Sequence, residues 1–161
     1  MSPRPDPVLA ADEAARALAR SLWHNADTAA LAFTDPATGA PMIARIGFGL
    51  AANGTGLTLV SDLAQHTRAL RASARAALLI GEPGPKGDPL NSPRLSVAVA
   101  ARFAATEDRA TLRACWLARH PKARLYADFA DFHFVRLDVI EAFLNGGFGR
   151  AHRIAAEDLQ G

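Results

Sequence analysis

Residues 29–61, AALAFTDPATGAPMIARIGFGLAANGTGLTLVS, hold three short apolar runs separated by two turn sequences. The turn sequences, DPATG at 35–39 and Asn53-Gly54, are typical of tight turns between strands. Strands joined by so few residues pair in antiparallel fashion, and the first two runs are expected to form a hairpin. The stretch therefore predicts the start of an antiparallel sheet, with strands at Ala29–Thr34, Pro41–Leu50 and Gly56–Ser61.

The same pattern continues on both sides of this stretch. Apolar residues at helical spacing predict three helices, at Val8–His24 (with Asp6 as a candidate N-cap), Asp62–Ala72 and Glu107–Arg119. Apolar runs predict further strands at Arg75–Gly81 and Arg94–Ala105, and two closing strands around a tight turn at 131–138 and 139–145. Residues 82–93, with four prolines and two glycines, read as an extended loop.

The order of these elements indicates the fold class. Strands and helices do not alternate as β-α-β, which argues against a Rossmann sheet. A mainly β fold, a small antiparallel barrel with peripheral helices, fits better. The length of 161 residues suits a single domain over 1–161, and three prolines in residues 1–7 predict a frayed tail there.

Composition narrows the function classes. No apolar run approaches the roughly 20 residues of a membrane helix, and the proline-rich N-terminus does not read as a signal peptide. The single Cys115 excludes a disulfide scaffold, so a cytoplasmic protein is expected. The net charge is +2, and the basic residues are dispersed among alanines and acids, so no nucleic-acid partner is expected.

The junction between the third strand and the next helix, LVSDLAQHTRAL (59–70), carries the clearest chemical signal. A helix that begins near Asp62 presents unpaired backbone N–H groups, which favour phosphate. His66, Thr67 and Arg68 follow one turn later and suit phosphate oxygens. The alternative is that Ser61 and Asp62 only cap the helix.

Two further sites could contribute. Arg45 lies in the middle of an apolar strand and needs a partner if its face is buried, whereas at an edge it would simply be solvated. In NGGFGRAH (145–152) the glycines allow backbone to approach a flat ligand, and Phe148, Arg150 and His152 supply stacking and donor groups, although a flexible turn also explains the glycines. The five histidines lack paired metal-ligand spacing, so no zinc or iron site is predicted, and His133 reads as a surface or interface histidine.

The strand with Arg45, the junction SDLAQHTRALRASARAALLI (61–80), the Pro/Gly loop and the terminal GGFGRAH (146–152) together resemble the pyridoxamine 5′-phosphate oxidase-like FMN-binding split-barrel superfamily. Within it, the chain looks most like the branch that includes the HugZ-type haem-utilisation proteins, over about residues 10–153. The resemblance implies a six-stranded antiparallel split β-barrel, a homodimer, and FMN bound at the dimer interface. It also implies an oxidoreductase acting on a small molecule that the sequence does not identify.

By this resemblance, Arg45 and the backbone of Ile46 and Gly47 would lie along the flavin, and Arg150 would approach it from one subunit. Ser61, His66, Thr67 and Arg68 would hold the phosphate, with His66 where many relatives have lysine. The tail lacks the Trp-Arg-x-x-Arg signature of the oxidase proper, so oxidation of pyridoxamine phosphate is not expected. Two alternatives stay open: a haem-binding or haem-degrading protein with His152 as iron ligand, and a non-catalytic flavin-binding module.

Overall fold

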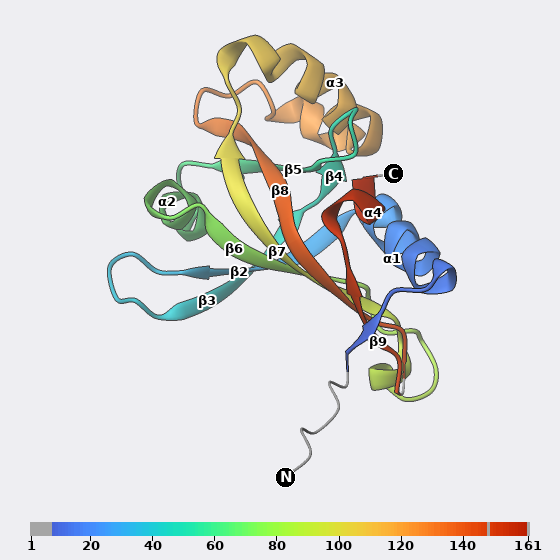
Figure 1. The fold of residues 1–161 in the computed structure, drawn as a ribbon. Coiled ribbons are helices and arrows are strands. Elements are labelled where there is room, and N and C mark those ends of the chain that lie inside the picture. The colour runs from blue at the N-terminus through green and yellow to red at the C-terminus, as the bar shows by residue number, and fades with distance from the viewer. Residues whose placement is uncertain (1–7, 148, 161) are drawn as a thin grey trace.

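The computed structural model of the chain describes residues 8–147 and 149–160, so the expected tail 1–7, the candidate cap Asp6 and Phe148 lie outside the described residues. The described part is mainly β with peripheral helices, as predicted (Figure 1). Its strands are β1 (Leu9–Ala10), β2 (Thr28–Thr34), β3 (Pro41–Gly47), β4 (Gly49–Leu50), β5 (Gly56–Ser61), β6 (Arg75–Ile80), β7 (Arg94–Phe103), β8 (Phe132–Asn145) and β9 (Ala151–Ile154). Its helices are α1 (Glu13–Asn25), α2 (Gln65–Ala72), α3 (Arg109–Arg119) and α4 (Ala156–Gln160), with 3-10 turns η1 (Pro89–Asn91), η2 (Thr106–Asp108) and η3 (Pro121–Leu125).

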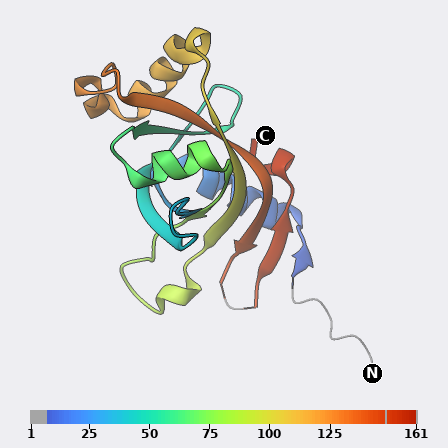
Figure 2. The same cartoon turned by 90° about the vertical axis from the view of Figure 1, so that its left-hand side faces the viewer.

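The sheet coils into the expected split barrel. Antiparallel pairing runs in the order β3-β2-β6-β7-β8-β5. The two ends of this series meet where the Thr58 hydroxyl of β5 donates a hydrogen bond of 2.8 Å to the Gly47 carbonyl of β3. Strand twist bends such a series around a central core, and Figure 2 shows the curved strands enclosing it.

The interior of the barrel is filled by alternate residues of each strand. On β2, the buried positions are Ala29, Leu31 and Phe33, while the residues between them face outward. Helix α1 covers one opening and buries Trp23, whose indole Nε1 donates to the Gly54 carbonyl at 3.0 Å. The Trp23 ring lies edge-on to Phe48 with 4.9 Å between ring centroids, which fixes α1 against the barrel.

A second apolar cluster lies under α3, at the top of Figure 1. Leu112 and Trp116 of α3 pack on Leu57 of β5 and Phe134 of β8, on the opposite face of these strands from the barrel interior. No helix among the described residues has the length and apolar character needed to cross a membrane.

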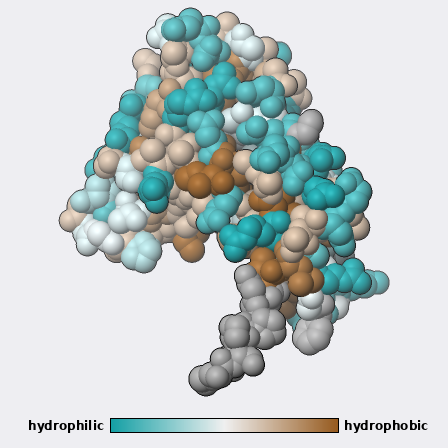
Figure 3. Space-filling model, viewed as in Figure 1, coloured by the Kyte–Doolittle hydropathy of each residue, from teal (hydrophilic) through white to brown (hydrophobic). Residues whose placement is uncertain are grey.

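The outer face of the barrel sheet carries exposed apolar side chains. In the strand register, Ile43, Ala32, Ala77 and Ala98 form one cross-strand row, and Leu79 lies in the next row. Ile43 is 74% exposed and Leu79 48%. Figure 3 shows hydrophobic residues gathered over β7 and β8 in the view of Figure 1, where Ile140 is 54% exposed. This face lacks a covering layer of helices within the described residues.

Two closing strands around a tight turn were expected in 131–145, and this prediction is wrong. Residues 132–145 form the single strand β8. Its pairing with β7 shifts by one residue, because Ala98 faces Glu141 while Val99 faces Val139, which leaves Ile140 as the extra residue of a β-bulge. The segment has no Gly or Pro before its end, so the strand bends at the bulge instead of turning back.

The first helix also begins later than expected. Asp12 is its N-cap, accepting a hydrogen bond of 2.7 Å from the Ala15 N–H, so α1 starts at Glu13 rather than Val8. The preceding Leu9 and Ala10 form β1, which pairs in parallel with β9. Neither of these short strands was predicted.

Candidate functional site

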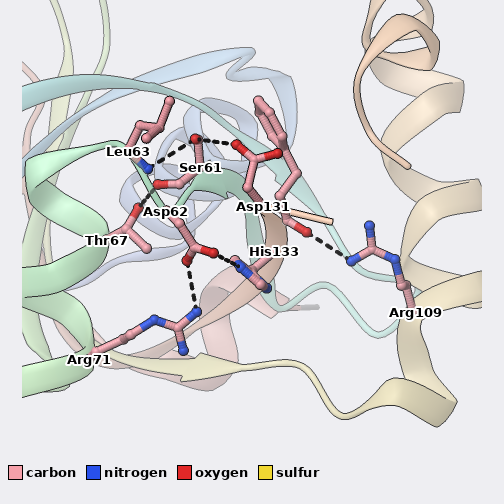
Figure 4. A network of polar contacts seen from close by, with 9 residues as sticks. Ser61, Asp62, Leu63, Thr67, Arg71, Arg109, Asp131 and His133 are labelled. Atoms are coloured by element: carbon pink, nitrogen blue, oxygen red, sulfur yellow. Dashed lines mark hydrogen bonds and ion pairs between the residues drawn. The ribbon is translucent and has the colours of Figure 1, made fainter. Parts of the chain in front are cut away.

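The predicted phosphate-binding junction starts with a turn, not with the helix. Helix α2 begins at Gln65, three residues after the predicted start at Asp62. The Ser61 hydroxyl donates to Asp131 Oδ2 at 3.1 Å and accepts from the Leu63 N–H at 3.2 Å (Figure 4). These bonds hold residues 61–63 against β8, so the Ser61 oxygen is occupied by protein groups and does not cap α2.

Thr67 and His66 differ in whether their polar side-chain atoms are free to bind a ligand. Thr67 is 1% exposed, and its hydroxyl donates to the Ser61 carbonyl at 2.6 Å. His66 lies half-buried against Phe33, with 6.1 Å between ring centroids. Burial lowers the pKa of His66, so its imidazole is neutral at pH 7. Arg68 is exposed. The hydrogen bond from the Ala37 N–H lowers the pKa of Asp35, and the charge of Arg68 adds a smaller contribution in the same direction.

The residues predicted to lie along the flavin, Arg45, Ile46 and Gly47, are on β3. Arg45 is exposed on the outer face, opposite Ala30, and has no hydrogen-bond or ion-pair partner among the described residues. Ile46 is buried in the core. A Cβ at Gly47 would lie 3.2 Å from the Trp116 ring of α3. Close packing of α3 therefore explains the glycine at this position without any ligand.

Arg150 and His152 lie at a different end of the molecule. Both line a cavity of about 230 Å³ between α1 and the end of β8, together with Asp12, Leu18 and Leu144. The Nδ1 atom of His152 is 3.2 Å from the Ala10 carbonyl oxygen of β1. In Figure 1 this end, at β9, is far from α2. Within one chain, the structure therefore separates the predicted residues into an α2–β3 group and a β9 group.

One polar network was not predicted as a site. Asp62 accepts a hydrogen bond of 2.9 Å from His133 Nε2 and pairs with Arg71 at 3.2 Å (Figure 4). The hydrogen bond from His133, with a further contribution from Arg71, lowers the pKa of Asp62. His133, expected to be a surface or interface histidine, is thus held by a residue 71 positions away. In the sequence, the only signal at His133 was its position between Phe132 and Phe134, and this did not indicate a polar network.

Comparison with known proteins places this geometry in a family. The model of the CREG β-barrel family matches residues 10–160. The chloroplastic non-canonical haem oxygenase HOZ of Arabidopsis thaliana is 32% identical in an alignment of 126 residues that covers 71% of this chain and 37% of that protein. The chain thus spans little more than a third of this relative.

Two solved structures bear on the fold. A haem-binding protein from Mycobacterium smegmatis is 29% identical and has a TM-score of 0.81, covering 98% of this chain and 61% of that one. A pyridoxamine 5′-phosphate oxidase-like protein from Listeria innocua is 14% identical with a TM-score of 0.64, covering 82% and 98%, and shares the fold alone. The expected split-barrel relationship is confirmed, and the chain belongs to the CREG β-barrel family.

Proposed function

We propose that this protein binds haem, with His152 as the ligand of the iron. The observation that carries the proposal is the contact of His152 Nδ1 with the Ala10 carbonyl oxygen at 3.2 Å. A carbonyl only accepts, so Nδ1 carries the proton and the lone pair lies on Nε2, the nitrogen that binds a metal. No described residue hydrogen-bonds Nε2. A histidine held in this way is oriented before the ligand arrives.

The surroundings of His152 fit one edge of a tetrapyrrole. Leu18 and Leu144 give the cavity an apolar wall, and Arg150 brings a positive charge that would pair with a propionate. A cavity of about 230 Å³ accepts only part of a haem, so the remainder would lie over the neighbouring surface or against a second copy of the chain. Bound haem would supply iron-centred redox chemistry, while the protein orients it and shields one edge.

The relatives support haem over other ligands. The curated relative at 32% identity is a haem oxygenase, and the solved structure at 29% identity is a haem-binding protein. The neighbours named for pyridoxamine phosphate oxidase or FAD share far less sequence. These relatives support our proposal that the ligand is haem, and we propose haem breakdown as the class of reaction.

The proposal is tested by adding ferric haem to the purified full chain and recording the visible spectrum. We expect a saturable Soret band distinct from that of free haem, reached at about one haem per chain. The His24→Gln variant is a suitable control, because His24 contacts the Leu159 carbonyl at 3.0 Å, away from the cavity, and glutamine can keep that bond. A spectrum that remains that of free haem at every ratio would contradict haem binding.

A flavin is the second candidate, favoured by the start of α2. Its N-cap, Ala64, offers no side-chain cap, and although the Thr67 N–H bonds to the Ala64 carbonyl, the N–H groups of Gln65 and His66 remain available to an anion. Arg68 lies in the same first turn, and Arg45 on β3 has no partner among the described residues. These groups would hold the phosphate of FMN, as the resemblance implies, in an oxidoreductase or in a non-catalytic flavin-binding protein.

The double variant Arg45→Ala with Arg68→Ala tests the flavin candidate. If FMN binds there, removing both cations should abolish its retention, because charge-assisted bonds to phosphate are the strong ones. The measurement is the visible spectrum of freshly purified protein, followed by chromatography of what heat releases. A double variant that still purifies with FMN contradicts this phosphate site, and a wild-type protein that neither carries nor takes up FMN contradicts the candidate itself.

We also propose that the chain forms a homodimer through the outer sheet face, with the cofactor near the interface. This face presents exposed Ile43, Leu79 and Ile140 among small residues, which suits close packing of a second sheet. A dimer could bring the β9 group of one copy beside the α2–β3 group of the other.

Charges placed on this face should break the dimer. For Ile43→Arg with Leu79→Arg we expect conversion of a dimer of about twice the 17.0 kDa chain mass to a monomer, because unpaired guanidinium groups would be buried in the interface. Sedimentation velocity measures the change. Leu125→Arg is the control, since Leu125 is exposed to an even greater extent than Ile43 and Leu79 but lies on η3, away from this face. A wild-type monomer, or a dimer that survives both changes, would refute the assignment.

A further inference from the structure

A small cavity is lined by residues from the C-terminal end of α2 and the beginning of α3. Both helices lie well away from β9 (Figure 1). Its volume is about 240 Å³. None of its lining residues carries a carboxylate, although two carry a guanidinium: the set is Arg71, Phe103, Ala104, Ala105, Thr106, Arg109, His133 and Phe134. We infer that this cavity is a binding site for a small carboxylate- or phosphate-bearing anion, separate from the haem and flavin candidates.

Arg109 supplies a fixed positive charge. Its Nη1 donates to the Phe132 carbonyl at 3.0 Å (Figure 4). Its Nη2 donates to the Ala127 carbonyl at 2.6 Å. These acceptors hold the guanidinium in place but carry no charge, and no ion pair to Arg109 is formed among the described residues. The guanidinium also lies 5.5 Å above the Phe134 ring. A cation that is positioned yet not neutralised is ready for an anion.

Arg71 provides the second cation from the other side. Its guanidinium carbon lies 4.2 Å above the Phe103 ring, which limits the directions it can take. It shares a single carboxylate, Asp62, with His133. The single carboxylate of Asp62 therefore faces both Arg71 and the imidazole of His133. Arg109 has no carboxylate partner of its own among the described residues.

His133 is oriented as a further polar contact. Asp62 accepts from its Nε2, so in the neutral ring the lone pair lies on Nδ1, and a protonated ring would offer Nδ1–H as a donor. The Thr106 hydroxyl lines the same cavity. Two other acids pair with arginines outside the cavity lining: Asp108 with Arg136 at 3.6 Å, and Asp128 with Arg113 at 2.7 Å. The hydrogen bond with Arg113, and to a smaller extent the charge of Arg109, lowers the pKa of Asp128.

The ligand class follows from size and lining. Two guanidinium groups favour oxyanions, which they bind through paired hydrogen bonds. Phe103 and Phe134 add apolar walls, which suits a short hydrocarbon or aromatic body attached to the anionic group. A volume of about 240 Å³ is enough to enclose a small carboxylate or phosphate completely.

The site is tested by calorimetric titration of the full chain with inorganic phosphate, acetate and benzoate, each at one ionic strength maintained with chloride. We expect saturable binding of at least one of them, weakened at least tenfold by Arg71→Gln. His133→Gln should also weaken it, because glutamine keeps a donor for Asp62 but lacks the second ring nitrogen. Arg102→Gln is the matched control, since Arg102 pairs with Asp138 outside the cavity.

Circular dichroism and thermal unfolding establish that each variant is folded. Binding that Arg71→Gln weakens while Arg102→Gln does not supports the site, whichever anion is preferred. Absence of binding by all three anions, or equal affinity of the Arg71→Gln and wild-type proteins, overturns it. Neither result depends on whether the chain binds haem or FMN.

Discussion

Haem added to the His152→Ala variant should give no Soret band of histidine-bound iron, and its affinity should fall by about tenfold to a hundredfold or more. The reason is that Nε2 of His152 would be the only protein bond to the iron at this cavity, whereas the remaining contacts, from Leu18, Leu144 and Arg150, hold the periphery of the ring. The measurement is a spectrophotometric titration beside wild type and His24→Gln.

Two further observations make this result specific. Added imidazole should restore the lost Soret band in His152→Ala, because the cavity left by the side chain admits the free ring. Arg150→Gln should weaken binding without changing the position of the band, since a propionate partner does not touch the iron. An unchanged band in His152→Ala would show that the iron ligand lies elsewhere in the chain.

Replacing Trp23 by alanine should cost about 3–5 kcal/mol of the free energy of unfolding, the usual range for a large aromatic removed from a core. Trp23 is fully buried and packs against Phe48 and the Gly54–Gly56 segment. A Cβ on Gly56 would lie only 3.0 Å from its ring, so the indole packs directly against the β5 backbone and its removal leaves a cavity there. Urea denaturation monitored by circular dichroism measures the loss.

Substitution of the second buried tryptophan, Trp116, should cost less free energy of unfolding than substitution of Trp23. Trp116 is also buried, but its indole Nε1 has no hydrogen-bond partner among the described residues. Trp116→Phe removes that unsatisfied donor and part of the ring, so we expect a cost below about 2 kcal/mol, smaller than for Trp23→Phe, which loses the bond to Gly54. Equal losses for the two phenylalanine variants would contradict this account of the two indoles.

Local signals in the sequence account for most of the barrel. DPATG and Asn53-Gly54 are correctly predicted turns, and the predicted strands on either side of them correspond to β2, β3 with β4, and β5. These predictions succeed because a hairpin is specified by a few neighbouring residues. The long loop at 82–93 is confirmed for the same reason, apart from the single turn η1.

Most of the failures have a different cause, since they depend on residues far apart in the sequence. The bulge at Ile140 exists only relative to β7, and β1 exists only because β9 lies beside it. At the candidate site, the sequence placed Ser61 and Thr67 correctly near each other. It could not show that Asp131, 70 residues away, occupies the Ser61 hydroxyl, or that Thr67 turns its own hydroxyl inward.

The pairing of β1 with β9 sets the time at which the proposed haem site can form. Ala10, whose carbonyl orients His152, lies 142 positions before it in the chain. At the roughly 5–20 residues per second of protein synthesis, Ala10 leaves the ribosome on the order of ten seconds before its partner. His152 is therefore not oriented until β9 has been synthesised and has paired with β1, so the proposed haem site forms late, after most of the barrel strands have been synthesised.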